Sequence, residues 1–302
     1  MRQAVALATP ARPRAPYPNG GSPLGRRLLT ALWGVPLVTV CMWFGGWLLA
    51  AAGAVLCGAA LLEFWSLGRA LGVGGPLRWE IAVGAALLLA GATLGLAPFA
   101  GALAAALLLV LIAGVLRAVA TPGGPALRGE LITTVWAMVA LLYIPWLLGH
   151  LLLLRGSAAG AGGLRLAVFA IVLVWLGDIA AYAAGGVVGR HRLAASVSPG
   201  KSVEGAVAAV AVGALAGGLL HAVVGLPPLV TAIVGAALAA AGMAGDLWES
   251  VLKRAADVKD SGGGIPGHGG VLDRFDSLLL GAPIAFWLLE RVPWAPLLHA
   301  LR

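Results

Sequence analysis

Apolar stretches of about 20 residues recur along this 302-residue chain, and they limit what it can fold into. A helix rises about 1.5 Å per residue, so each stretch is long enough to cross the roughly 30 Å hydrocarbon core of a bilayer. Charged residues make up only 11% of the chain, whereas soluble domains contain about 25%. The sequence therefore predicts an all-α, polytopic bundle of transmembrane helices.

Glycine, proline and charged residues divide the chain into nine apolar segments. The expected spans lie near 28–46, 47–66, 80–96, 98–117, 131–153, 164–187, 203–225, 228–252 and 271–290. They leave no room for a separate soluble domain, so residues 28–302 are expected to form a single membrane domain. The preceding segment, 1–27, is rich in proline and arginine, which is typical of a disordered basic tail.

The distribution of lysine and arginine supports this topology. If the N-terminus is cytoplasmic, only Arg155, Arg165, Arg291 and Arg302 of the 20 Lys and Arg residues fall outside, which leaves 16 inside. Short cytoplasmic loops are enriched in these residues, and one span more or fewer would move every later loop to the other side. We therefore expect a multi-pass protein of the inner (cytoplasmic) membrane with an internal N-terminus. The net charge of +8 is explained by these loops, and no nucleic-acid partner is expected.

Acidic residues concentrate in the last third of the chain. Eight of the 12 lie between 178 and 276, namely Asp178, Glu204, Asp246, Glu249, Asp257, Asp260, Asp273 and Asp276. The same region contains Lys and Arg residues and the glycine-rich stretch 261–270. Carboxylates, cations and glycine-rich turns at one membrane surface suit a polyanionic phosphate substrate that is bound with a divalent metal. We therefore expect the functional region at 170–280.

Two pairs of carboxylates in this region have helical spacing. Asp246 and Glu249 lie near the end of the eighth expected span, and Asp273 and Asp276 lie at the start of the ninth. Residues three apart share one face of a helix, so each helix end can offer carboxylates to a shared metal site. The alternative is that these are ordinary interfacial charges paired with nearby arginines. The density of carboxylates, cations and glycines within about 30 residues favours a site.

Residues 250–276 also contain a dense motif. It reads Ser250-Val-Leu-Lys253-Arg254-x4-Lys259-Asp260-x-Gly262-x2-Ile265-Pro266-x-His268-Gly269-Gly270-Val271-x-Asp273-Arg274-Phe275-Asp276. Upstream stand Trp175-x-Gly177-Asp178-x2-Ala181-Tyr182, Gly189-Arg190-His191, Ser198-Pro199-Gly200-Lys201-Ser202-Val203-Glu204-Gly205 and, far earlier, Glu63-Phe64. Together they resemble the phosphatidate cytidylyltransferase (CDP-diacylglycerol synthase) family. Two positions depart from the family pattern: Gly200 replaces a common Lys, and Ile179 replaces a common Thr or Ser.

The resemblance implies transfer of a cytidylyl group from CTP to phosphatidic acid, which yields CDP-diacylglycerol and pyrophosphate. It also implies dependence on Mg²⁺, with a monovalent cation such as K⁺ nearby, a cytoplasmic active site, and, by analogy, a homodimer. The attacking group is already a phosphate oxyanion, so catalysis requires positioning and charge neutralisation rather than a strong general base.

The candidate site residues form three groups. The expected metal ligands are Asp246, Asp273 and Glu249. The catalytic group adds cations that clamp the phosphates, namely Lys253, Arg254, Lys259 and Arg274, together with His268, which binds either a phosphate oxygen or the backbone of its own turn. The expected substrate-binding residues are Ser198, Lys201, Glu204, Asp178, Tyr182, Ser250, Asp260, Gly269, Gly270 and Asp276.

Several alternatives remain open from the sequence. Tyr182 either stacks on cytosine or anchors the membrane interface. Glu63 either has a function or pairs with Arg69 at the same end of its span. A transporter is a second function class, although its polar groups should lie at mid-membrane in broken helices. An enzyme of the same fold that acts on another lipid phosphate is a third, and the undifferentiated apolar walls do not distinguish it.

Overall fold

The computed structural model describes residues 32, 36–75, 78–121, 123–157, 161–263 and 269–294. The expected tail at 1–27 and His268 lie outside the described residues. Within these ranges the chain is predominantly helical, and five helices are long and apolar enough to cross a membrane. The expected all-α membrane bundle is therefore confirmed at this level.

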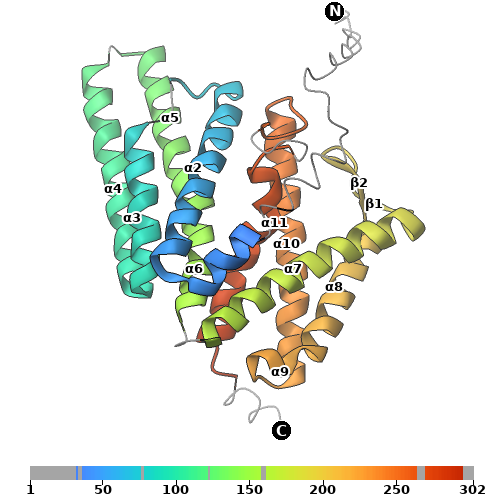
Figure 1. Ribbon diagram of the computed structural model, residues 1–302. Coiled ribbons are helices and arrows are strands. Elements are labelled where there is room, and N and C mark those ends of the chain that lie inside the picture. The colour runs from blue at the N-terminus through green and yellow to red at the C-terminus, as the bar shows by residue number, and fades with distance from the viewer. Residues whose placement is uncertain are drawn as a thin grey trace, which may run out of the picture.

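The N-terminal half is a bundle of helices (Figure 1). A helix at 36–44 turns at Gly45. It is followed by α2 (Gly46–Ala70), α3 (Trp79–Leu94), α4 (Leu96–Ala120), α5 (Pro125–Leu141), the π-helix η1 (Leu142–Trp146) and α6 (Leu147–Gly156). Pro145 lies inside η1. Proline lacks the backbone N–H that an α-helix needs, and the wider π-helical turn lets the helix continue past it. Residues 125–156 therefore form one long apolar segment.

A network of charges ties three of these helices together. Arg78 donates two hydrogen bonds to Glu130, at 2.6 and 2.8 Å. Arg117 of α4 pairs both with Glu130 of α5, at 2.9 Å, and with the fully buried Glu80 of α3. The charges of the network balance, which permits its burial between the helices.

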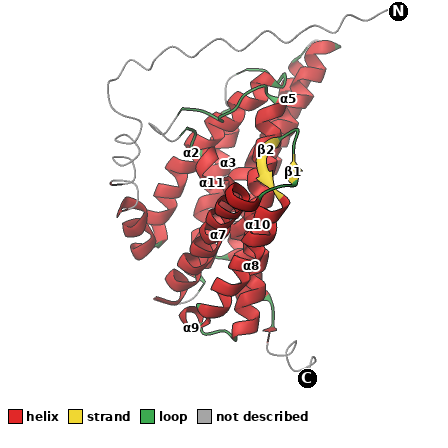
Figure 2. Ribbon diagram, turned by 90° about the vertical axis from the view of Figure 1, so that its right-hand side faces the viewer, coloured by secondary structure: helices red, strands yellow, loops and turns green. Residues whose placement is uncertain are grey.

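The C-terminal half is built around α10. Its elements are α7 (Ala161–Val188), the strands β1 (Arg192–Ala194) and β2 (Ser198–Ser202), α8 (Val203–Leu219), the single-turn α9 (His221–Val224), α10 (Pro228–Ala255), α11 (Leu272–Phe286) and the π-helix η2 (Trp287–Arg291). The α10 helix packs against α7, α8 and α11. The two strands form an antiparallel hairpin in which Arg192 pairs with Ser202. This hairpin lies next to the meeting point of α7, α8 and α10 (Figure 2).

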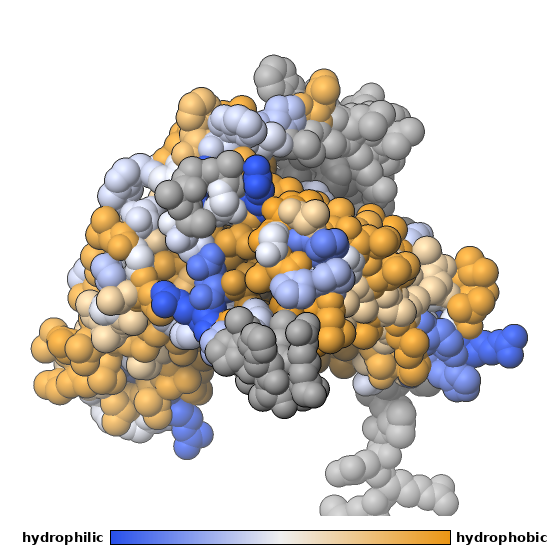
Figure 3. All heavy atoms as spheres, turned by 90° about the horizontal axis from the view of Figure 1, so that it is seen from below, coloured by the Kyte–Doolittle hydropathy of each residue, from blue (hydrophilic) through white to orange (hydrophobic). Residues whose placement is uncertain are grey.

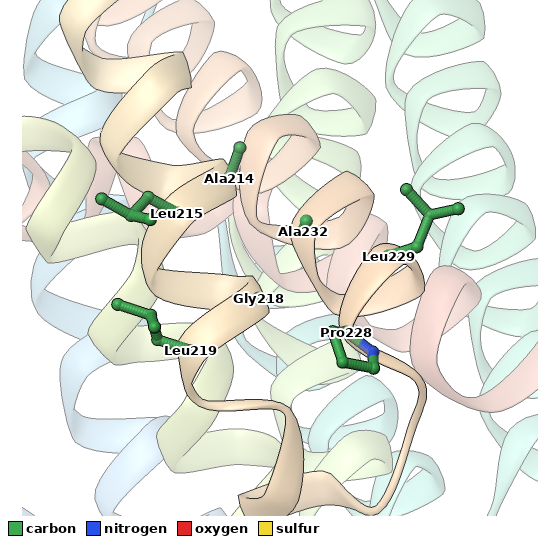
Figure 4. A pocket seen from close by; sticks show the side chains of 7 residues that line it. All are labelled: Ala214, Leu215, Gly218, Leu219, Pro228, Leu229 and Ala232. Atoms are coloured by element: carbon green, nitrogen blue, oxygen red, sulfur yellow. The ribbon is translucent and has the colours of Figure 1, made fainter.

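Small residues set the distance between α8 and α10. A Cβ atom added at Gly213 or Gly235 would meet the backbone of the other residue, and one added at Gly217 would meet the carbonyl of Thr231. Glycines thus allow the two backbones to approach closely. The resulting van der Waals packing holds the helices together in lipid, where no hydrophobic force does so. Near the opposite end from the hairpin, these helices border a shallow apolar groove of about 450 Å³ (Figure 4). It is lined by Ala214, Leu215, Gly218, Leu219, Pro228, Leu229 and Ala232.

Every expected span overlaps a helix in the described residues, although α3 and α8 are shorter than the five long helices. The ends of α2, α4 and α10 and the beginnings of α5 and α11 gather at one end of the molecule (Figure 1). Seen from the opposite end, apolar residues dominate the surface and hydrophilic residues form small groups (Figure 3). Nine crossings and a cytoplasmic N-terminus remain predictions.

Candidate active site

A cavity of about 820 Å³ lies between α7, the hairpin, α8 and α10. Five of the predicted residues line it: Asp178, Tyr182, Ser198, Lys201 and Asp246. Some other lining residues, such as Ser202, belong to the motif segments but were not predicted as site residues, and Met243 lies outside those segments. The hairpin that supplies several of them is only 11 residues long and has no strong alternation of apolar and polar residues, so periodicity does not reveal it.

Lys201 and Asp246 form the central ion pair of this cavity. Lys201 Nζ lies 2.7 Å from Asp246 Oδ2, and the side chains are 20% and 37% exposed. One residue comes from β2 and the other from α10, so the pair fastens the hairpin to the central helix. Asp178 of α7 lies close enough to interact electrostatically with both members of the pair and with Asp276. The cavity thus gathers acidic groups around a cation.

The carboxylates of α10 and α11 lie close together because a glycine at the contact lets the two helices approach each other. A Cβ atom at Gly245 would collide with the carbonyl oxygen of Asp276. The resulting approach places Asp276 within electrostatic reach of Glu249. Glu249 is fully buried and lies within hydrogen-bond reach of the Asp276 carboxyl, and no N–H or O–H donor among the described residues reaches its Oε1 atom. Since an unpaired buried carboxylate oxygen is costly, it indicates a place for a bound cation or proton.

Tyr143 of η1 also belongs to this cluster, although sequence reasoning did not select it. Its hydroxyl is buried without a hydrogen-bond partner in the described part of the chain. It lies close enough to interact electrostatically with Glu249, Asp276 and Asp246. A π-helical turn often marks a functional position, and Pro145 within η1 is the signal that could have indicated one.

Lys253 connects the two helices at their polar end. Its Nζ atom lies 3.1 Å from Glu249 Oε2 and 2.8 Å from Asp273 Oδ1. Asp273 also accepts hydrogen bonds from the backbone N–H groups of Ser261, at 3.2 Å, and of Gly270, at 2.9 Å. Asp273 thus binds backbone donors from Ser261 and Gly270, two residues that precede α11. Its role as a metal ligand remains a prediction.

The glycines before α11 are shaped by the same carboxylate. Gly269 has a φ of 81°, which a residue with a side chain rarely adopts. A Cβ atom there would lie 3.0 Å from Asp273 Oδ2.

Glu63, whose role the sequence left open, also reaches the motif region, because it accepts a hydrogen bond from Ser261 Oγ at 3.0 Å. Its observed partners thus lie in the motif region rather than at Arg69.

The remaining predicted cations lie around the cluster rather than within it. Arg254 donates to the carbonyl oxygens of Val197, at 3.1 Å, and Val258, at 3.2 Å, and so links the hairpin to the end of α10. Lys259 and Arg274 are exposed. Lys201 and Lys253 contact the carboxylates of Asp246, Glu249 and Asp273 directly.

Glu204 has a local structural environment. Its carboxylate accepts hydrogen bonds from the N–H groups of Arg190, at 3.1 Å, and His191, at 3.2 Å, and its Oε1 lies 2.6 Å from His191 Nδ1. The neighbouring Ser202 caps α8 by accepting from the N–H of Gly205. Glu204 thus fastens the start of α8 to the segment after α7. It does not line the cavity.

Two predicted substrate-binding residues lie elsewhere on the same end of the molecule. Ser250 is buried on α10, one position after Glu249, and Asp260 is exposed in the segment that follows this helix. Neither lines the cavity, so their contact with a substrate remains a prediction.

Comparison with known proteins gives a consistent result. The model of the cytidylyltransferase family matches residues 25–292. A phosphatidate cytidylyltransferase of Synechocystis is 31% identical over 291 residues, which cover 87% of this chain and 95% of that protein. Those of Bacillus subtilis and Pseudomonas aeruginosa are 40% and 42% identical over 129 and 137 residues, or 42% and 44% of this chain.

These two shorter alignments span about half of each relative, 48% and 50% of its length. The family model, in contrast, covers both the N-terminal bundle and the α7–α11 region. Because that match extends over most of the sequence and the Synechocystis relative aligns over nearly its whole length, the chain belongs to the cytidylyltransferase family.

Proposed function

We propose that this protein transfers the cytidylyl group of CTP to phosphatidate. A phosphate oxygen of phosphatidate forms a bond to the α-phosphorus of CTP. The bond between this phosphorus and the oxygen that bridges it to the β-phosphorus breaks. The products are CDP-diacylglycerol and pyrophosphate. Family membership and the names of the relatives support this reaction. The observation that carries it is the two-sided lining of the 820 Å³ cavity. Asp178, Lys201 and Asp246 provide a polar side, and alanines of α7, α8 and α10 provide an apolar side.

This lining suits a lipid head group. The polar side can hold phosphates by charge neutralisation, and the apolar side can accept the beginning of the acyl chains. The attacking oxygen is already anionic, so the main tasks are to hold two polyanions together and to stabilise the charge on the leaving pyrophosphate. Lys201 and Lys253, which contact the carboxylates, are proposed for these tasks, and the exposed Arg254, Lys259 and Arg274 are proposed to add positive charge. Tyr182, 88% exposed, is proposed to stack on cytosine.

Mg²⁺ is part of the proposal, and the donor set fits it. Within the described residues, no three His, Cys, Asp or Glu side chains are arranged as a metal-binding group. Mg²⁺, however, is usually held by one or two carboxylates and completes its shell with water and substrate phosphates. Asp246 lines the cavity, and Glu249 carries an unpaired buried oxygen, so these two are the proposed ligands together with Asp273. Bound Mg²⁺ would supply positive charge against the triphosphate. A monovalent cation such as K⁺ is proposed nearby.

The proposed location is the inner membrane, with nine crossings and the active site facing the cytoplasm. The enrichment of lysine and arginine on one side and the gathering of the motif segments at one end support this orientation. The polar groups are expected at one membrane surface rather than in broken helices at mid-membrane, which argues against a transporter. A homodimer is proposed by analogy with the family.

The test is an assay of purified protein with radiolabelled CTP, phosphatidate and Mg²⁺. Lipid-extractable label is expected with wild-type protein and with Arg165→Ala, an exposed residue near the start of α7. Lys201→Ala should reduce it strongly. A polyprenyl phosphate in place of phosphatidate tests the alternative substrate. Absence of lipid label with phosphatidate, or faster labelling of the polyprenyl phosphate, would contradict the proposal.

A further inference from the structure

Glu63 connects the N-terminal bundle to the start of α11. Its Oε1 atom accepts a hydrogen bond from the N–H of Val271 at 2.9 Å, and its Oε2 atom accepts from the N–H of Leu272 at 2.8 Å. The first N–H groups of a helix have no partner within the helix, and Val271, at the N-cap, makes no side-chain cap. A carboxylate from α2 therefore caps α11 across 208 residues of sequence. Its negative charge also suits the positive end of the helix dipole.

Two glycines of the motif make room for this carboxylate. A Cβ atom at Gly262 would lie 2.6 Å from Glu63 Oε1, and one at Gly270 would lie 2.6 Å from Oε2. Both distances are shorter than a van der Waals contact allows, so neither position accepts a larger residue unless the carboxylate moves. The motif glycines on both sides of 264–268 are thus fitted to a residue of another helix.

Glu63 and Asp273 hold the same peptide segment from two sides. Ser261 donates its hydroxyl to Glu63 and its backbone N–H to Asp273. Gly270 donates its N–H to Asp273, and the next two N–H groups go to Glu63. Since Asp273 in turn contacts Lys253, a displacement of Glu63 would move the groups that set the Asp273–Lys253 pair.

We propose that Glu63 is a positioning residue for cytidylyl transfer. Glu63 does not line the cavity, but it fixes Ser261 and the first turn of α11, and thereby the place of Asp273 beside Lys253. This inference rests on the proposed function. The role needs two acceptor oxygens, and a glutamine would turn one of them into an NH₂ donor that faces other donors. An aspartate keeps both acceptor oxygens, but its side chain is one methylene shorter, so the carboxylate lies farther from the N–H groups of α11.

The test compares Glu63→Gln, Glu63→Asp and the control Glu80→Gln. Glu80 is a buried carboxylate of the same N-terminal bundle, and it pairs with Arg117 rather than with the motif segment. Glu63→Gln should lower kcat roughly 10- to 100-fold, the usual effect of losing charge-assisted hydrogen bonds, while KM for CTP changes less than about 3-fold. Glu63→Asp should recover part of kcat, and Glu80→Gln should retain it. Thermal unfolding and gel filtration determine the folded fraction of each variant.

Two further measurements separate positioning from stability. Hydrogen exchange of a peptide that covers 261–276 should rise in Glu63→Gln and not in Glu80→Gln. Ser261→Ala and Glu63→Gln should be non-additive in kcat, because both remove the same contact. An active wild type with unchanged kcat per folded molecule in Glu63→Gln would refute the positioning role alone. A wild type that forms no CDP-diacylglycerol would refute the proposed function and, with it, this role.

Discussion

The ammonium group of Lys253 lies 2.8 Å from Oδ1 of Asp273, so one ion pair joins the end of α10 to the start of α11. Lys253 also contacts the fully buried Glu249. The side chains of Lys253 and Asp273 are only 14% and 10% exposed, so solvent screens this arrangement weakly. The lysine is therefore both a part of the site and a support of the fold that holds it.

Replacing Lys253 by alanine should remove activity and reduce stability together. The change leaves Glu249 and Asp273 without their common cation, and breaking a buried pair costs about 3–5 kcal/mol. We expect a fall in the unfolding temperature and at least a roughly 100-fold loss of cytidylyl transfer, equivalent to about 3 kcal/mol. Lys259→Ala, at an exposed position six residues on, is the stability control for loss of a positive charge. Equal stability of the two variants would contradict the bridging role of Lys253.

Asp246→Asn should change the response of the enzyme to Mg²⁺. The substitution removes a carboxylate of the cavity but keeps its size, and it breaks the pair with Lys201. Half-maximal activity should require roughly 10-fold more Mg²⁺, since even changes to residues that only support metal ligands commonly weaken metal affinity by this order. The measurement is a Mg²⁺ titration of initial rates after removal of metal with EDTA. Glu204 lies outside the cavity, so Glu204→Gln should leave the Mg²⁺ concentration for half-maximal activity unchanged. An unchanged concentration in Asp246→Asn would exclude Asp246 as a ligand.

Gly270→Ala should destabilise the motif segment, whereas Gly263→Ala should not. A Cβ atom at position 270 would collide with Ser261 Oγ and the Glu63 carboxylate, but one at position 263 has no atom within 4 Å. Overpacking of this kind costs about 1–3 kcal/mol. Thermal unfolding of the two purified variants checks this difference, and the activity of Gly270→Ala should fall with its stability. A stable and active Gly270→Ala protein would show that Glu63 can move aside without consequence.

Cysteine labelling can test the membrane orientation. The native Cys41 and Cys57 are both buried, so they should give little background with a membrane-impermeant maleimide. Gly263→Cys should react only from the cytoplasmic side, and Gly156→Cys, at the end of α6, only from outside. Both positions have open space for a side chain. Reaction of both from the same side would refute the nine-span arrangement.

The sequence predicts the helices well because their length and apolar content are local properties. Each expected span overlaps a helix in the described residues, and ion pairs do join the motif segments of β2, α10 and α11. The sequence does not reveal which helices become neighbours. The contact between Gly245 and Asp276 that joins α10 and α11 depends on a single small residue in a chain that contains 45 glycines.

Side-chain roles are harder to predict because they depend on contacts across distant segments. Arg254 resembles a phosphate-binding cation in the motif, but its guanidinium donates to backbone carbonyls on both sides. Glu204 resembles a substrate ligand, but it binds the N–H groups after α7. The partner of Glu63 lies about 200 residues away, at Ser261, so no local pattern could indicate it.

The long separation between Glu63 and α11 has a consequence for biosynthesis. A ribosome completes α2 more than 200 residues before Val271 and Leu272 are made. Until then the N–H donors that Glu63 binds in the finished protein do not exist, and a carboxylate in or near the membrane is costly without them. Formation of α11 therefore both relieves this cost and completes the end of the molecule that contains the motif. A nascent chain that stops before α11 lacks these donors, and its Glu63 carboxylate is left without them.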